Sequence, residues 1–151
     1  MTTRIYAGAA QWISGDQAPR PGGLFRRAVG DDGWQRLGGG LPEDVEVRAI
    51  AVHPRDEQVI YAGTQYGPYR STDGGEHWAE LNFPDTGMAV WSFLFDPGDA
   101  KRLYAGTAPA GLYRSDDGGD TWRRLRTFKA PGRVTMNFPC RATPSFLRRA
   151  L

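Results

Sequence analysis

The chain has 151 residues, the size of one ordinary domain, and 40% of them are hydrophobic. Mean hydropathy is −0.53 and no apolar run approaches the roughly 20 residues that a membrane helix needs, so we expect a soluble chain with no membrane partner. The first residues show no signal peptide, and the single cysteine, Cys140, excludes an internal disulfide. Both observations favour a cytoplasmic location.

The net charge of +2 is unevenly distributed along the chain. Residues 1–122 hold 11 Lys and Arg residues and all 17 Asp and Glu residues, whereas residues 123–151 hold eight basic residues and no acidic one. A basic arm is compatible with nucleic-acid binding, which predicts an affinity that falls steeply with salt and is lost when residues 126–151 are deleted. We favour the alternative that this tail does not belong to the repeated part of the chain, so nucleic acid is not the expected partner.

Three tryptophans return at a constant interval, since Trp34, Trp78 and Trp122 are each 44 residues apart. A constant interval of this size indicates a repeat protein. The sequence Tyr-Ala-Gly-Thr also occurs before the second and the third tryptophan, beginning at Tyr61 and at Tyr104. We therefore expect the three tryptophans to occupy equivalent buried positions, and the two tyrosines to be equivalent to each other.

The first repeat begins late and carries an insertion. Strands are expected at residues 4–8, 24–26 and 33–37, with no counterpart of the innermost strand before them. The segment between the first two strands is about ten residues longer than in the later repeats. Insertions in repeat proteins usually lie in loops on one face, which is often the binding face.

The second and third repeats each contain four β-rich segments separated by turn residues. The eight segments are residues 48–53, 58–64, 68–72 and 76–81, followed by 91–96, 101–107, 112–116 and 121–125. Four short strands in about 44 residues are typical of a β-propeller blade. We expect an all-β fold of about three four-stranded antiparallel blades in an open, incomplete ring. The blades would span residues 4–125, divided as a partial blade at 4–37 and blades at 46–81 and 89–125.

Three blades are too few to close a propeller, which needs roughly four to eight. We therefore expect a fragment of a longer protein, or a homo-oligomer in which several chains complete one ring. Two copies would supply about six blades, and closed cyclic assemblies are common. Residues 126–151 form a basic tail, interpreted either as the start of a further blade near residues 133–138 or as a disordered segment.

Two copies of one motif precede the last two tryptophans. Residues 71–78 and 115–122 both read Ser-x-Asp-x-Gly-x-x-Trp. The motif resembles the Asp-box, or BNR repeat, of the β-propellers of sialidases, xyloglucanases, sortilin-type receptors and photosystem assembly factors. The resemblance covers residues 4–125, and it implies a glycosyl-hydrolase-like propeller. The first copy, at residues 27–34, has no serine and its Asp and Gly are displaced.

The motif has a structural explanation. An Asp side chain accepts hydrogen bonds from turn amides, glycine adopts backbone conformations that other residues resist, and Trp buries a large apolar surface. In the family that the chain resembles, this turn lies on the face away from the ligand. The residues expected to be structural are Ser71, Asp73, Gly75, Trp78, Ser115, Asp117, Gly119 and Trp122. The nearby carboxylates lack the spacing of a calcium loop, so we expect neither a metal nor a cofactor.

The ligand face of a propeller carries the loops between second and third strands and between successive blades. Trp12, Asp16 and Arg20 lie in the insertion, where an aromatic ring and two charges suit a flat, polar ligand. The alternative is an ordinary surface loop with its tryptophan packed on its own blade. Further candidates on this face are Gln65, Tyr66, Trp91, Met88 and Arg133. For Trp91, burial beneath the rim is the alternative.

Catalytic residues are not assigned by the sequence. Glycosidases use two carboxylates that flank the bond, and 17 acidic residues offer many pairs. The Arg-Ile-Pro motif of sialidases is absent, because Tyr6 follows Arg4-Ile5. His53 and His77 lack metal-ligand spacing, and the glycine triplet at residues 38–40 lacks the Lys and Ser or Thr of a phosphate-binding loop.

The leading hypothesis is a non-catalytic propeller segment that acts as a binding or assembly scaffold for a carbohydrate or protein ligand. The alternative is a truncated glycoside hydrolase of the sialidase or xyloglucanase type. Whether the chain is an enzyme therefore stays open at this point, and activity on a panel of glycans separates the two hypotheses.

Overall fold

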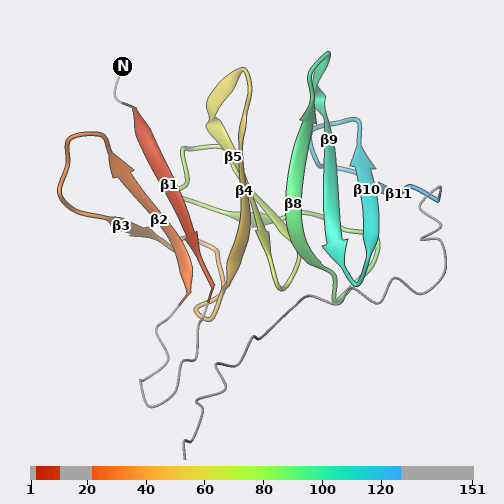
Figure 1. Cartoon of the computed structure of the whole chain (residues 1–151), viewed down its shortest axis with the longest axis horizontal. Helices are drawn as coiled ribbons and strands as arrows, with labels where there is room; N and C mark the ends of the chain where they lie inside the picture. The colour runs from red at the N-terminus through yellow and green to blue at the C-terminus, as the bar shows by residue number, and fades with distance from the viewer. Residues whose placement is uncertain (1–2, 11–21, 127–151) are drawn as a thin grey trace, which may run out of the picture.

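The computed structural model describes residues 3–10 and 22–126 of the chain. In these ranges the chain forms eleven β-strands in three antiparallel sheets, and no helix (Figure 1). The predicted all-β class with three consecutive antiparallel sheets is confirmed. Since the described residues form no helix, none of them belongs to a helix that could cross a membrane.

Each sheet is a meander whose strands pair in chain order, so local hairpins build it. The first sheet contains β1 (Arg4–Ala9), β2 (Gly23–Ala28) and β3 (Gln35–Leu37). The second contains β4 (Val47–His53), β5 (Asp56–Thr64), β6 (Pro68–Ser71) and β7 (Ala79–Glu80). The third contains β8 (Ala89–Asp96), β9 (Asp99–Ala108), β10 (Gly111–Ser115) and β11 (Arg123–Arg124). In the described residues the first sheet has three strands, as its late start predicted.

The three sheets stand side by side, with β4 between β1 and β8 (Figure 1). Alternate residues of a strand point to opposite faces, so the central sheet contributes to two cores. In β5, Ile60 and Ala62 belong to the core shared with the first sheet, and Tyr61 belongs to the core shared with the third. The second sheet is therefore covered by protein on both faces.

A glycine in the second strand lets the next sheet approach. A Cβ on Gly8 would lie 2.8 Å from the backbone oxygen of Val47, and one on Gly63 would lie 2.7 Å from that of Val90. Any other residue would push the sheets apart at these two points. Gly106 occupies the same place in β9, since it follows Tyr104 as Gly63 follows Tyr61.

The prediction of three equivalent buried tryptophans is wrong for Trp34. Trp78 and Trp122 are only 5% and 9% exposed, whereas Trp34 is 46% exposed. The two buried rings pack in cores shared with the preceding sheet, and the described residues contain no sheet before the first. The exposed Trp34 ring instead carries the Arg27 guanidinium at 5.1 Å.

The tryptophans also precede the fourth strands that were predicted to contain them, because Trp78 ends a turn and β7 begins at Ala79. The expected equivalence of Tyr61 and Tyr104 is confirmed, since they pair with Arg70 and Arg114 in the same register.

Replacing a buried tryptophan should destabilise the fold far more than replacing an exposed one. We expect Trp78→Ala to lower the free energy of unfolding by about 3–5 kcal/mol, the range for large aromatic deletions in cores. Trp91→Ala, which removes a ring that is 55% exposed, should cost less than about 1 kcal/mol. Urea denaturation followed by circular dichroism measures both, and equal losses would contradict this assignment of the core.

Candidate functional site

Residues 71–78 and 115–122, here called the box turns, close through one set of hydrogen bonds. The Ser71 hydroxyl accepts from the Gly75 N–H at 2.8 Å and donates to the Asp73 carboxylate at 2.8 Å. That carboxylate accepts the His77 N–H at 3.0 Å, and the Trp78 indole N–H donates to the Gly75 carbonyl at 2.9 Å. The second box turn repeats these bonds within 0.1 Å, through Ser115, Asp117, Gly119, Thr121 and Trp122.

The carboxylates of both box turns are held in the ionised form. The His77 backbone N–H is the main donor that keeps the pKa of Asp73 well below its usual range, followed by the His77 ring and the Ser71 hydroxyl. For Asp117, the Thr121 hydroxyl and then its backbone N–H lower the pKa to about 2. Because their oxygens accept bonds from inside the turn, this geometry supports a structural role for both.

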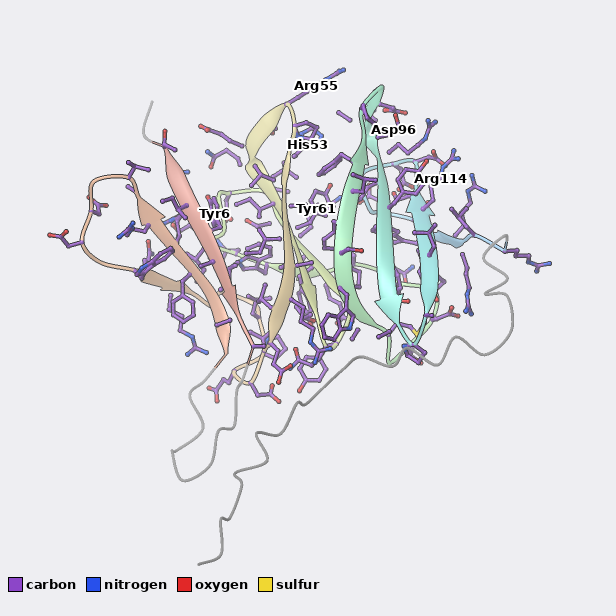
Figure 2. All side chains as sticks on the ribbon, viewed as in Figure 1. Tyr6, His53, Arg55, Tyr61, Asp96 and Arg114 are labelled. Carbon is purple, nitrogen blue, oxygen red and sulfur yellow. The ribbon has the colours of Figure 1, made fainter. Side chains whose placement is uncertain are left out.

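Each box turn is bound by the sheet before it. The Tyr6 hydroxyl and the Arg26 guanidinium donate to the Gly74 carbonyl at 3.1 Å and 2.9 Å. Arg26 also pairs with Glu76 at 2.5 Å. Figure 2 shows Tyr6 on the first sheet, next to the second.

The same contacts recur between the second and third sheets. The Tyr61 hydroxyl and the Arg70 guanidinium donate to the Gly118 carbonyl at 2.7 Å and 2.9 Å, and Arg70 pairs with Asp120 at 2.8 Å. Burial raises the pKa of Tyr61, so its hydroxyl stays a donor. We call the Tyr and Arg donors on one box-turn carbonyl the clamp. It was not predicted from the sequence, although a Tyr and an Arg at corresponding places before each box turn were its signal.

The glycine triplet serves the first of these interfaces. The Gly39 carbonyl accepts the Trp78 N–H at 2.7 Å. A Cβ on Gly39 would lie 2.2 Å from the Glu76 backbone oxygen, and one on Gly40 would lie 2.3 Å from that of Trp78. Gly39 and Gly40 therefore allow two backbones to touch, which explains these two glycines without a phosphate ligand.

Gln65 and Tyr66 brace the segment that links the first and second sheets. The Gln65 side chain accepts the Glu46 N–H at 2.7 Å and donates to the Asp44 carbonyl at 2.8 Å. The Tyr66 hydroxyl donates to the Asp44 carboxylate at 2.5 Å, and this bond raises the pKa of the phenol. Both ends of the Gln65 amide are thus occupied, whereas the Tyr66 ring is exposed.

Arg48 and Trp91 form the most exposed aromatic contact next to this brace. Each lies where the pairing register of its strand shifts: Arg48 between Val47 and Ala49 in β4, and Trp91 between Val90 and Ser92 in β8. Such bulges redirect a side chain. The Arg48 guanidinium lies 4.7 Å from the centre of the Trp91 ring and pairs with Glu46 at 2.7 Å. Burial of Trp91 beneath the rim, the alternative considered above, is wrong, because the side chain is 55% exposed.

We call this set of linked residues the Arg48–Trp91 patch. It consists of Asp44, Glu46, Arg48, Gln65, Tyr66 and Trp91. Three predicted candidates are therefore brought together, whereas Met88 is buried in the core between the second and third sheets. Trp12, Asp16, Arg20, Arg133 and the tail from residue 127 lie outside the described residues.

Four described carboxyl groups have a pKa displaced from its usual value, and none is displaced in the direction that a glycosidase's proton donor needs. The pKa values of Asp73, Asp96, Asp116 and Asp117 are all lowered by N–H, hydroxyl or guanidinium donors. A general acid needs the opposite displacement. Among residues 3–10 and 22–126, no three metal-ligating side chains cluster.

The comparisons with known proteins concern the propeller fold. No family model matches the chain. It is similar to the xyloglucanase Xgh74A of Acetivibrio thermocellus, with 28% identity over 102 residues, which cover 62% of this chain and 12% of that relative. The chain thus spans a small part of the length of the curated protein that it matches.

Solved structures agree with this likeness. A GH74 xyloglucanase from Xanthomonas campestris matches 82% of this chain and 22% of its own, with a TM-score of 0.63 and 22% identity. An ancestral GH74 enzyme matches 68% of this chain and 15% of its own, with a TM-score of 0.58 and 25% identity. YCF48 bound to a D1 peptide matches 67% of this chain and 33% of its own, with a TM-score of 0.52 and 18% identity. The three sheets are therefore consecutive blades of an incomplete β-propeller.

The box-turn carboxylates should make stability depend on acid pH. The folded pKa of Asp117, about 2, lies below its ordinary value of 3.8, so the folded state binds fewer protons than the unfolded state. The stability that it contributes is complete above pH 3.8 and is lost as the pH falls toward 2. Asp117→Asn should weaken the dependence of the melting temperature on pH over this window. Glu57→Gln, an exposed control, should leave that dependence unchanged. If the melting temperature changed with pH in the same way for the wild type and both variants, this assignment would be contradicted.

Proposed function

We propose that the chain is a segment of an Asp-box β-propeller that binds an oligosaccharide through the Arg48–Trp91 patch without cleaving it. Two turns with the Ser-x-Asp-x-Gly-x-x-Trp sequence and one hydrogen-bond pattern support membership of the Asp-box family. The observation that carries the binding role is the exposed Trp91 ring with the Arg48 guanidinium beside it.

The chemistry of the patch suits a sugar. An exposed indole offers a flat apolar face for the C–H face of a pyranose ring. The carboxylates of Asp44 and Glu46 and the guanidinium of Arg48 lie in the same patch, where they offer acceptors and donors to hydroxyl groups. The likeness to xyloglucanases supports a β-glucan backbone as the first ligand to test.

The same contacts argue against catalysis by this patch. The Asp44 carboxylate accepts the Tyr66 hydroxyl, and Glu46 is paired with Arg48. A glycosidase needs one carboxyl group that gives a proton and a second that stabilises or attacks the sugar. Both carboxylates are thus engaged by neighbouring side chains of the patch, as expected of binding groups rather than of a catalytic pair.

The second candidate is a truncated glycoside hydrolase. The 28% identity to xyloglucanase Xgh74A favours it, although the match covers 12% of that protein. The two candidates differ in whether the isolated chain releases reducing ends from xyloglucan.

Calorimetric titration with xyloglucan oligosaccharides tests the binding role. We expect saturable binding that Trp91→Ala and Arg48→Ala each weaken roughly tenfold, which is about 1.4 kcal/mol. Arg55→Ala is the matched control, because Arg55 lies in the β4–β5 hairpin at the other end of the sheet (Figure 2).

Three outcomes separate the candidates. Release of reducing ends by the intact chain would favour the truncated hydrolase. Absence of binding to xyloglucan and other β-glucan oligosaccharides would overturn the carbohydrate role and favour a protein ligand. Equal losses for Arg48→Ala and Arg55→Ala would show that the patch is not the site.

A further inference from the structure

The same contacts occur at both interfaces between sheets. The earlier sheet supplies a Tyr from its second strand and an Arg from its third, and both donate to one carbonyl of the next sheet's box turn. It also supplies a leucine after or at the end of its last strand, Leu37 or Leu81, which is buried in the same core as the Trp of that turn. The later sheet supplies the carbonyl, an acidic residue two positions on, and the Trp.

The third sheet carries the donor half of this clamp with no described sheet to receive it. Tyr104 pairs with Arg114 in the register of Tyr61 and Arg70, and Leu125 follows Leu81 at the 44-residue interval. Arg114 now pairs with Asp116 at 2.6 Å. Leu94, opposite Tyr104 on the same face, is 66% exposed.

The first sheet carries the acceptor half, also uncovered. The Val29 N–H donates to the Thr3 carbonyl at 2.9 Å. In the same way, the Gly74 N–H donates to the Gln58 carbonyl and the Gly118 N–H donates to the Lys101 carbonyl. Val29 therefore has the backbone pairing of the two clamped glycines, with one residue more between it and the Trp, and the acidic residue two positions on is Asp31. The Trp34 ring completes the set.

We propose that the outer face of the third sheet binds the first sheet of a second copy of this chain. In this head-to-tail contact, Tyr104 and Arg114 donate to the Val29 carbonyl, and Arg114 pairs with the acidic turn, meaning Asp31 and Asp32. Trp34 packs against Leu125. Ile5, which is 38% exposed, meets the apolar face that includes Leu94.

Charge complementarity supports a second copy of the chain as the partner. Residues 127–151 contain no acidic side chain and no box motif to pair with Arg114. The acidic turn offers two carboxylates next to the backbone carbonyl that the clamp requires. Two copies joined at both ends form a closed ring of about six sheets, which lies within the range of roughly four to eight that closed propellers use.

The contact rests on the clamp and on apolar packing rather than on a first strand. In the first two interfaces, the backbone of Val47 or Val90 fills the space over Gly8 or Gly63. The described part of the first sheet has no such strand. The hollow of about 340 Å³ over Gly106, which Trp91 also lines, therefore stays open at the joint.

A charge-swap experiment on the full chain tests the contact. Multi-angle light scattering of the wild type should give twice the chain mass of 16.7 kDa. Arg114→Glu should raise the dissociation constant about 30-fold or more, because a carboxylate would then face Asp31 and Asp32, and like charges across an interface cost several kcal/mol. The double variant Asp31→Lys, Asp32→Lys should do the same. Circular dichroism confirms that each variant is folded.

Mixing the two variants decides between this contact and a general loss of association. In the mixed pair one joint is wild type and the other has the charges exchanged, so a 1:1 dimer should form although neither variant dimerises alone. A wild type that stays monomeric, an Arg114→Glu variant that dimerises normally, or a mixture that stays monomeric would each overturn the proposal. Oligosaccharide binding is measured separately, so failure of this contact does not by itself overturn the binding role.

Discussion

The structure depends on one backbone carbonyl for each interface. Gly74 and Gly118 have positive φ, a conformation that glycine adopts without steric cost. Each carbonyl accepts a phenol and a guanidinium from the preceding sheet, and the guanidinium is shared with an acidic side chain. A partly buried, charge-assisted hydrogen bond of this kind is stronger than a neutral one and fixes direction as well as distance. The clamp therefore ties each box turn to the sheet before it.

Because every sheet needs its neighbours, stability in this architecture is a sum of interfaces. The second sheet shares one core with the first and another with the third. The end sheets lack one partner each among the described residues, and their outer faces keep apolar side chains exposed, with Trp34 on one and Leu94 on the other. Repeat proteins with such ends either cap them with polar residues or continue the array.

The two ends of the sheets have different tasks. In an antiparallel meander, successive connections alternate between the two ends, so the box turns share an end with the β4–β5 hairpin. At that end, the Asp and Ser side chains bond within their own turns. The opposite end carries Gln65, Tyr66 and the segment of Asp44 and Glu46, where exposed aromatic rings and charges meet. Hydrogen bonds within the turns thus dominate one end, and exposed aromatic and charged side chains dominate the other.

The amino-acid sequence by itself determined the repeat, the strand order and the two box turns. Those features are local, because eight contiguous residues contain every donor and acceptor that closes a box turn. Only the tertiary structure decided which side chains are covered. Trp34 has the spacing of Trp78, but no described sheet precedes it to bury its ring. Gly39 and Gly40 are explained only by the backbone of Glu76 and Trp78 beside them. Arg48 gave no signal in the sequence, because a bulge in β4 and the neighbouring β8 bring it to Trp91. Burial and clamping depend on residues far apart in the chain, so spacing alone does not reveal them.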